Sequence, residues 1–570
     1  RQENILLILS LKSEWLQNIP KFTSKENNFI DNIKKMNKNK FFLFLHSIGL
    51  IILTYLLLNK INLDTDVELN IYFEILLFSF ACRALGSPVR VVISLFYGLT
   101  LGLQVSSLRS TGDFVSTLTL DNLSEFRAIG QSQFIETLLV TFTYCLVSLT
   151  CLIPRKTKFS VHFIILFIPL FFTDGAISNF SSALHGFYKQ LTYKPSYNYP
   201  DIAKKYLKFN VYESSHHISF IESKPKNVII IFTEGFSSRV IDRENTLDLH
   251  LTPNIDKLYD EGVIVKNYYN HTAATFRGLR GQLTSAYQYR DGTNNKVGGF
   301  FQISHKEVET NYFGRLISLP SILNENDFNT FFLASTENDS NLNALLKSMP
   351  FRKVYGMEDF GWKQGDRMSD KKVFESLKQL LENYSTDTPF FIGVYPSGTH
   401  HGMDSPDVRY KDGNNKIYNK FYNYDYQLGE FINYFKKSKY YNDTILVITA
   451  DHASFPAPEF KKSFDVDTNY FVDKIPLIII GAGLQRTVID GTGKNSLSLT
   501  PTILNMLGIK NHANYFIGCS LFDNNCHTPF QHISAIGDDI YIINKNPDGI
   551  YEVNPESINK DISEYYTISG

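Results

Sequence analysis

The sequence has 570 residues, with 56 basic and 57 acidic side chains and a formal net charge of −1. This balance argues against a nucleic-acid-binding protein, which needs a clustered excess of positive charge, so no nucleic acid is expected as a partner. The length allows a membrane region together with one large domain, and the first third of the chain is much more apolar than the rest.

Five apolar segments in the first third predict a membrane domain over residues 1–175, because a spanning helix needs about 20 mostly apolar residues. Basic residues lie before the first segment, between the second and third, and between the fourth and fifth, whereas acidic residues occupy the alternate loops. Basic loops stay in the cytoplasm, so the N-terminus is expected inside and the chain after about residue 175 outside. The alternative is that the segments are core helices of a soluble protein. The segments are Phe41–Leu58, Leu69–Leu85, Val91–Val105, Phe134–Ile153 and Val161–Phe172.

The sequence begins at Arg1 rather than methionine, which leaves open whether residues precede it.

Residues 176–226 have a mixed composition and are expected to connect the membrane domain to a catalytic domain at 227–570. Beyond residue 227, β-branched apolar runs alternate with helix-like stretches, which is typical of an α/β domain with helices on both faces of a sheet. The apolar runs have the composition of buried strands of a parallel sheet. The expected strands are Val228–Phe232, Val263–Tyr268, Thr330–Ala334, Phe390–Tyr395, Ile445–Thr449 and Pro476–Ile480.

Polar side chains follow three of these runs. Glu234 comes directly after the first, Thr275 lies in a turn after the second, and Asp451 and His452 follow Ile445–Thr449. Functional groups of such sheets gather beyond the carboxyl ends of the strands. A carboxylate, a hydroxyl and an Asp-His pair that meet there form a metal site with its own nucleophile, because metal coordination both positions and activates a hydroxyl.

Each of these residues also has a structural interpretation. Glu234 is compatible with a carboxylate at a helix N-terminus, and Thr275 with an N-cap, which does not exclude catalysis. Thr272 is the alternative nucleophile.

Other residues are candidates for substrate contacts. His400 follows the strand Phe390–Tyr395 and is expected to contact phosphoryl oxygens or protonate a leaving group, with His401 as the alternative. Arg277 and Arg280 are expected to neutralise phosphate oxygens, unless they pair with structural carboxylates. Trp362 is a candidate for the wall of a substrate groove, or else a packed core residue.

Together these motifs resemble the sulfatase-like transferases of the alkaline phosphatase superfamily, which include lipoteichoic acid synthases and the phosphoglycerol and phosphoethanolamine transferases. Three further segments carry the resemblance: Thr-Pro-Asn-Ile-Asp at 252–256, Leu-Thr-Pro-Thr-Ile-Leu at 499–504 and Gly-Cys-Ser-Leu-Phe at 518–522. The resemblance implies an alkaline phosphatase/sulfatase-like sheet between helices. It also implies that one divalent metal, with manganese favoured and zinc or magnesium as alternatives, is bound by Glu234, Thr275, Asp451 and His452.

The resemblance also implies a function, namely the transfer of a phospholipid head group through a Thr275 phosphodiester to a hydroxyl on a cell-envelope glycan or lipid. The Thr-Phe-Arg-Gly-Leu run at 275–279 is similar to that of phosphoglycerol transferases, so phosphoglycerol is favoured over phosphoethanolamine. The expected location is the bacterial cytoplasmic (inner) membrane, crossed several times, with the catalytic domain extracytoplasmic. A hydrolase of envelope polymers and a non-catalytic binding module are the rival functions.

Two departures restrict the chemistry. The position of the nucleophile holds neither the cysteine nor the proline of hydrolytic sulfatases, so a formylglycine enzyme is not expected. Asp451 and His452 are not followed by the Gly-Glu pair and nearby histidine of the phosphoethanolamine enzymes. Cys519 and Cys526 are close enough to form a disulfide if this part of the chain lies outside the cytoplasm.

Overall fold

The structure is a computed structural model that describes most of the chain. The described ranges are 38–59, 65–82, 87–116, 131–150, 167–192, 199–213, 224–289, 312–362, 368–466, 471–523, 525–528, 530–543, 550–552 and 556–569, with a few short pieces between them. The chain divides into two compact units, the first formed by Arg1–Ser106 and Glu136–Phe180, the second by Ser107–Ile135 and Ser181–Gly570. Each unit is described by itself.

Helices of the first unit coincide with the first four predicted apolar segments. They are α3 (Lys38–Leu58), α4 (Thr65–Ala81), α5 (Ser87–Thr111) and α7 (Gln131–Leu149). The fifth segment lies mainly outside the described residues, where only the short 3-10 helix η5 (Pro169–Phe172) is seen. Among the described helices, Pro88–Thr111 alone has the length and apolarity of a membrane span, and His46–Leu58 and Phe134–Leu149 are shorter apolar helices. A core helix of a soluble protein meets the same criterion, so the number of spans stays a prediction.

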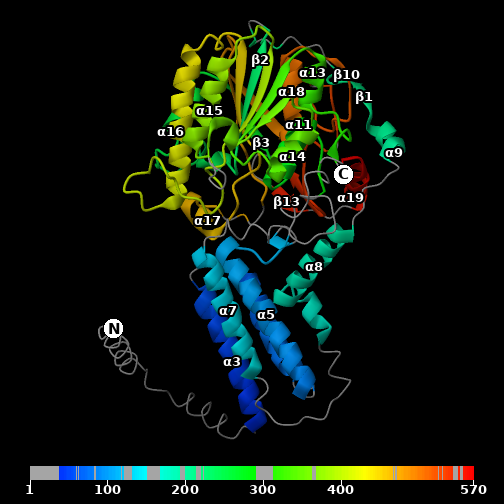
Figure 1. The fold of residues 1–570 in the computed structure, drawn as a ribbon. Helices are drawn as coiled ribbons and strands as arrows, with labels where there is room; N and C mark the ends of the chain where they lie inside the picture. Colours follow the sequence, from blue (N-terminus) through cyan, green and yellow to red (C-terminus); the bar gives the residue numbers. More distant parts are fainter. Residues whose placement is uncertain are drawn as a thin grey trace. The chain divides into compact units, whose positions relative to one another are not determined.

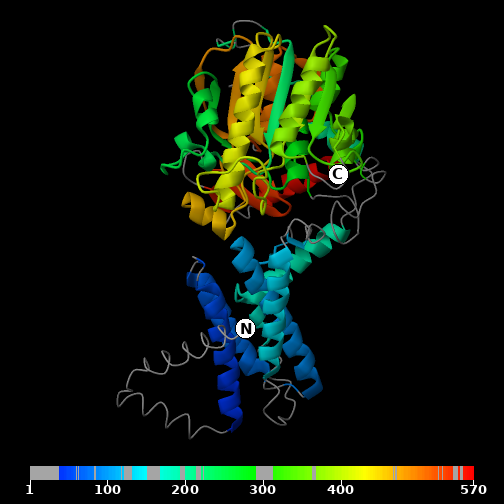
Figure 2. The ribbon, with the colours of Figure 1, turned by 60° about the vertical axis from the view of Figure 1, so that its left-hand side comes forward.

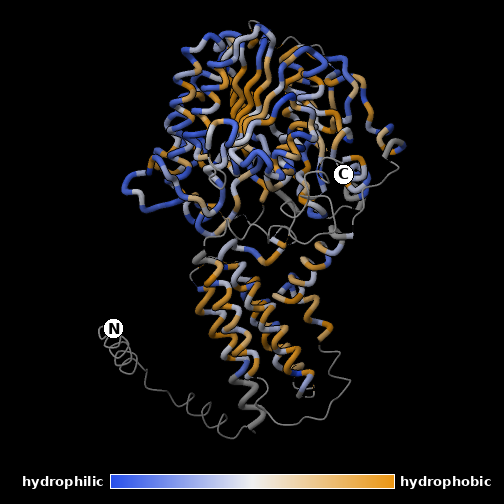
Figure 3. Tube along the Cα trace, viewed as in Figure 1, coloured by the Kyte–Doolittle hydropathy of each residue, from blue (hydrophilic) through white to orange (hydrophobic). Residues whose placement is uncertain are grey.

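Helices α5 and α7 pack at backbone contact. A Cβ added to Gly98 would lie 2.8 Å from the Cα of Cys145, and one added to Gly102 would lie 2.6 Å from the Cα of Thr141. Small residues four apart allow this close approach, which is common where helices associate in a membrane. The opposite surface of α7 is apolar and open, because Leu139 and Phe142 are each about 60% exposed (61% and 62%). Figure 3 shows that these helices are hydrophobic along most of their length.

The second unit is built on an eight-stranded sheet with strand order β5-β4-β6-β2-β7-β8-β3-β9. The sheet is mixed: β8 is antiparallel to both of its neighbours, β7 and β3, whereas the remaining pairs are parallel. The expected α/β class is therefore confirmed, but an all-parallel sheet is not. The strands are β2 (Asn227–Thr233), β3 (Val263–Tyr269), β4 (Asn329–Ala334), β5 (Lys353–Tyr355), β6 (Phe390–Tyr395), β7 (Thr444–Ala450), β8 (Leu477–Gly481) and β9 (Thr487–Asn495).

Helices cover both faces of this sheet (Figures 1 and 2). One face carries α10 (Pro253–Leu258), α15 (Asp370–Asn383) and α16 (Lys416–Lys437), and the other carries α11 (Thr275–Thr284), α13 (Leu319–Glu325), α14 (Asn341–Ser348) and α18 (Leu499–Met506). Every residue of β2, β6 and β7 is buried between these two layers. Complete burial explains why these strands are continuous apolar runs in the sequence.

The segment before the main sheet is joined to this unit at two places. Strand β1 (Lys208–Asn210) pairs with β10 (Asn511–Asn514) in an antiparallel ladder. Helix α9 (Tyr199–Tyr206) packs on α19 (Glu556–Ser569), where Tyr206 and Tyr565 make an edge-to-face contact. A small sheet of β11 (Ile533–Ile536), β12 (Asp539–Ile543) and β13 (Ile550–Glu552) lies near the end of the chain. Helix α8 (Ala176–Thr192) precedes α9, and α17 (Pro458–Phe464) follows β7.

Cys519 and Cys526 form a disulfide that closes a short loop, with a sequence separation of 7. Reduction of this bond is expected to lower the free energy of unfolding of the second unit by about 2.5 kcal/mol, because the unfolded chain regains the freedom of the closed loop. Urea unfolding of detergent-solubilised protein with and without reductant would measure the difference. The Cys519→Ser/Cys526→Ser variant is the control, since its stability should not respond to reductant; an equal response in both proteins would contradict the prediction.

Candidate active site

Glu234 lies at the carboxyl end of β2, directly after its last residue. Its backbone is held from two sides: its N–H donates to the carbonyl of Pro396 (3.2 Å) and its carbonyl accepts from the hydroxyl of Thr399 (2.5 Å). The side chain is only 3% exposed. The sheet therefore presents one carboxylate at a fixed position in a water-poor environment.

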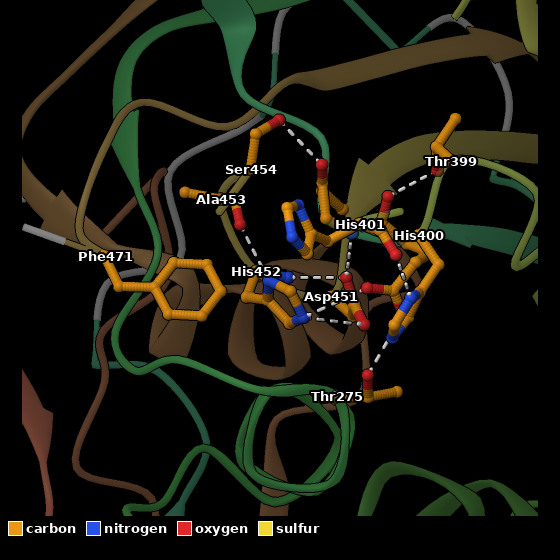
Figure 4. Close-up of polar contacts among 12 residues, drawn as sticks. Thr275, Thr399, His400, His401, Asp451, His452, Ala453, Ser454 and Phe471 are labelled. Carbon is orange, nitrogen blue, oxygen red and sulfur yellow. Dashed lines mark hydrogen bonds and ion pairs between the residues drawn. The ribbon is translucent and has the colours of Figure 1, made fainter. Parts of the chain in front are cut away.

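Asp451 and His452 lie beside Glu234 because β7 runs parallel to β2. Thr233 pairs with Ala450 in the ladder, so the residues that follow them come together beyond the strand ends. His452 Nε2 lies 3.4 Å from Glu234 Oε1 and 3.5 Å from Asp451 Oδ2 (Figure 4). One ligand atom from each of these three residues lies within 4.8 Å of the others. The structure thus brings together three of the predicted metal ligands.

Each side chain of this group has one atom fixed by the protein and one atom left for a ligand. Asp451 Oδ1 accepts from the N–H groups of Gly235 (2.8 Å) and His452 (2.7 Å), whereas none of the described residues donates a hydrogen bond to its buried Oδ2. His452 Nδ1 lies 2.7 Å from the carbonyl of Ala453 and must be the protonated nitrogen there. The lone pair of Nε2 is consequently directed at the carboxylates, an orientation typical of a metal-binding histidine.

Thr275 is the first residue of α11, and its hydroxyl reaches the same group. Oγ1 lies 3.0 Å from Glu234 Oε2 and 3.5 Å from the hydroxyl of Tyr395. The helix N-terminus favours negative charge at this position. Ala274, the preceding residue, has a φ of 71°, which is uncommon for a residue other than glycine and marks a backbone constrained at this point. The rival Thr272 is directed elsewhere, because its hydroxyl donates to the carbonyl of Ala535 (2.7 Å).

Two residues seat α11 against the end of β7. A Cβ at Gly278 would lie 2.2 Å from the carbonyl oxygen of Asp451, so only glycine allows the helix to come this close. The amide of Gln282 donates to the carbonyls of Ala450 (2.8 Å) and Asp451 (3.1 Å). The position of the Thr275 hydroxyl therefore depends on contacts made one and two turns farther along the helix.

The electrostatics of the group are dominated by the burial of two carboxylates. Burial raises the pKa of Asp451, and the negative charge of Glu234 raises it further. For Glu234, burial acts in the same direction, but His452, His400 and Tyr395 together hold its pKa below the ordinary value. For His452, burial acts to lower the pKa, but Asp451 and Glu234 raise it to about 9. In the absence of another cation, a proton on His452 therefore offsets part of the negative charge.

A divalent metal ion fits this group. Manganese, zinc and magnesium accept oxygen and nitrogen donors of the kinds that this group offers. These donors are Asp451 Oδ2, the lone pair of His452 Nε2, the Glu234 carboxylate and the Thr275 hydroxyl. A bound cation would also replace the proton on His452 and neutralise the two buried carboxylates.

The loop after β6 lies over the group. Figure 4 shows the His400 imidazole directed toward Thr275, as the sequence predicts for a substrate-contacting histidine. His400 Nδ1 lies 2.9 Å from the carbonyl of His401, which leaves Nε2 available. His401 packs its ring on Phe455, with ring centroids 5.0 Å apart. Its predicted role stays a prediction.

The other predicted substrate residues have structural contacts. Arg280 is buried, donates to the carbonyl of Ser569 (2.6 Å) and lies 4.4 Å from the ring of Tyr312. Arg277 is also buried, and its charge interacts with Tyr566 of α19. Trp362 packs against the hydrophobic core, with the ammonium of Lys372 4.3 Å from its ring. None of these described contacts reaches the Glu234 group, so a substrate role for these three residues stays a prediction.

Tyr395, Gly278, Gln282 and Lys420 are neighbours of the site that sequence reasoning missed. The hydroxyl of Tyr395 makes a short hydrogen bond to Glu234 Oε2. Its position as the last residue of β6, next to the strand β2 that Glu234 follows, is the signal that could have identified it.

Comparison with known proteins identifies the domain that contains this group. Residues 226–509 match the sulfatase family model. This part of the chain is a sulfatase-family domain. Over 330 residues the chain is 23% identical to lipoteichoic acid synthase 2 of Bacillus subtilis (strain 168), a match that covers 54% of this chain and 48% of that protein. The chain thus spans about half the length of this curated relative.

Two solved structures are also similar to the chain. A protein of the alkaline phosphatase superfamily from Vibrio parahaemolyticus is 18% identical, with a TM-score of 0.48, and the match covers 67% of this chain and 96% of that one. The lipoteichoic acid synthase LtaP from Listeria monocytogenes is 20% identical, with a TM-score of 0.46, and the match covers 65% of this chain and 95% of that one. Sulfatase and alkaline phosphatase superfamily enzymes use a divalent metal, and the Glu234, Asp451 and His452 group is the corresponding candidate site.

Asp451→Asn should weaken metal binding at least about tenfold, because the amide keeps the shape of the side chain but removes its charge and one ligand oxygen. Titration of metal-free protein with Mn²⁺, followed by metal analysis after desalting, would measure the loss. Asp443→Asn is the matched control, since Asp443 directly precedes the first residue of β7 and so lies at the other end of this strand from Asp451. Equal metal content in the two variants would contradict the assigned site.

The affinity for Mn²⁺ should rise with pH. A metal ligand must be the neutral imidazole, and the proton on His452, with a pKa of about 9, competes with the metal at any lower pH. Between about pH 6 and pH 8 the affinity should therefore increase up to about tenfold per pH unit. Mn²⁺ titrations at several pH values would measure the slope, and His452→Gln should flatten it. A pH-independent affinity in the wild-type protein would refute this.

Proposed function

We propose that this protein is a membrane-anchored, metal-dependent transferase that moves a phospholipid head group to a hydroxyl on a cell-envelope glycan or lipid. Phosphoglycerol is the favoured group. The observation that carries the proposal is the position of the Thr275 hydroxyl, at a helix N-terminus and 3.0 Å from a carboxylate of the metal-binding group. A binding module would not need a hydroxyl held at that point.

In the first half of the reaction, Thr275 Oγ1 bonds to the phosphorus of the donor and the bond to diacylglycerol breaks. The proton of Thr275 passes to the carboxylate of Glu234, whose Oε2 lies 3.0 Å from the hydroxyl, and a proton from His400 is delivered to the departing oxygen of diacylglycerol. A bound divalent cation, with manganese favoured, would stabilise negative charge on the threonine and phosphoryl oxygens. In the second half, an acceptor hydroxyl gives its proton to His400 and bonds to the phosphorus, and the bond to Thr275 Oγ1 breaks as this oxygen takes its proton back from Glu234.

The residues around Thr275 determine how this hydroxyl is held. Tyr395 and Thr275 both contact Glu234 Oε2. Burial and the charge of Glu234 hold the pKa of Tyr395 well above its ordinary value, so it acts as a neutral donor and fixes the carboxylate. Burial of the whole group keeps bulk water low, which favours an organised acceptor over hydrolysis.

The first unit supports a membrane location for the reaction. Its helices expose large apolar side chains that would be unfavourable in water, including Phe73 (58%), Val92 (67%) and Phe142 (62%). We infer that it crosses the bacterial cytoplasmic membrane several times, with the sulfatase domain outside. This arrangement would hold the active site near a phospholipid donor.

Thr275→Ala should abolish formation of a covalent head-group adduct and lower turnover at least about a thousandfold, because no other hydroxyl occupies its position. Mass spectrometry of the peptide that contains Thr275 would detect the adduct after incubation of detergent-purified protein with phosphatidylglycerol and manganese, without acceptor. Thr275→Ser is the conservative control and should retain the adduct.

Two other outcomes are informative. Normal turnover by Thr275→Ala would refute the mechanism. Steady release of a free head group by the wild-type protein, without an adduct or an acceptor, would instead support a hydrolase.

A further inference from the structure

Lys420 is a buried cation next to the active-site loop. It lies on α16 and is only 7% exposed. Its ammonium donates to the carbonyl of His400 (3.2 Å), and no carboxylate of the described residues forms an ion pair with it. The ammonium also lies 4.9 Å from the ring of Phe421, and within the described part of the chain its charge is not paired with a carboxylate at contact distance.

The ammonium lies within electrostatic range of the catalytic group. Burial lowers the pKa of Lys420 to about 8, while the negative charges of Glu234 and Glu459 act to raise it, so the side chain remains mainly cationic at neutral pH. The same charge interacts with His401. Lys420 thus contributes positive charge to the loop that carries His400, which is directed at Thr275 in Figure 4.

The hydrogen bond to His400 does not require a charge at this position, and the ring of Phe421, 4.9 Å from the ammonium, offsets only part of the cost of burying that charge. A neutral amide could donate to the His400 carbonyl equally well, whereas an ammonium without a contacting anion is costly to bury. Such a charge becomes favourable when an anion enters the site. A phospholipid donor supplies one, because its phosphodiester carries a negative charge.

We propose that Lys420 is a specificity-determining residue, which selects donors with an anionic phosphodiester and an uncharged head group and rejects those whose head group carries a cation. This inference rests on the proposed function. Phosphatidylglycerol and phosphatidylethanolamine share the phosphodiester and differ in the charge of the head group. A fixed ammonium beside the site attracts the phosphodiester of both lipids but repels only the ethanolammonium group.

The test compares the rates of Thr275 adduct formation with the two lipids in matched detergent micelles. The wild-type protein should favour phosphatidylglycerol at least about tenfold, the scale expected for like charges near a protein surface. Lys420→Met should reduce that ratio at least about tenfold, mainly through faster reaction with phosphatidylethanolamine, and Lys420→Arg should preserve it. Lys437→Met is the matched control on the same helix, because Lys437 is exposed and should not affect the ratio.

Three outcomes separate this inference from the proposed function. An unchanged ratio in Lys420→Met, or a wild-type preference for phosphatidylethanolamine, would overturn the role of Lys420 while leaving the transferase intact. An adduct with neither lipid would overturn the transferase. In that case, competition binding of glycerol 1-phosphate and phosphoethanolamine to the full-length protein would still test Lys420, since equal binding of the two would refute charge selection.

Discussion

The structure of the site depends on the close approach of two buried carboxylates, Glu234 and Asp451, at the ends of neighbouring parallel strands. Two negative charges in a water-poor environment are unfavourable unless a cation or a proton compensates them. The protein places His452 between them, and fixes Asp451 with two backbone N–H groups rather than with a basic side chain. The charge that is not compensated makes the group suitable for a divalent cation, and the pairing of β2 with β7 holds the two carboxylates close together.

Much of the central sheet could be predicted from the sequence, because its inner strands are buried on both sides. The bounds of β6 agree with the expected run Phe390–Tyr395, and those of β2 and β7 agree to within one or two residues. Strand β9 (Thr487–Asn495) was missed because an edge strand with alternating exposure has no apolar run. Helix α16 begins at Lys416 because the side chain of Asn415 caps its N-terminus by accepting from the backbone N–H groups of Ile417 and Tyr418.

The site was predictable to the extent that its residues stand at strand ends. Glu234, Asp451 and His452 follow apolar runs, so elementary rules about parallel sheets bring them together. Lys420 could not be recognised in this way, since it looks like an ordinary helical lysine, and the signal for Tyr395 is only its place at the end of the strand next to β2. Both residues lie near the site because the elements that carry them, β6 and α16, pack beside the other elements of the site. That arrangement is set by strand order, which the apolar runs do not encode.

The packing of α11 against the end of β7 has a consequence for how the nucleophile can be exchanged. The helix is held by the absence of a side chain at Gly278 and by the amide of Gln282, and neither contact involves Thr275 itself. The first position of the helix is thus free to carry any small nucleophilic side chain without altering its support. In the proposed reaction, the attacking atom is thus separate from the contacts that position it, and we expect that exchanges at this one position can change the reaction while the rest of the domain is retained.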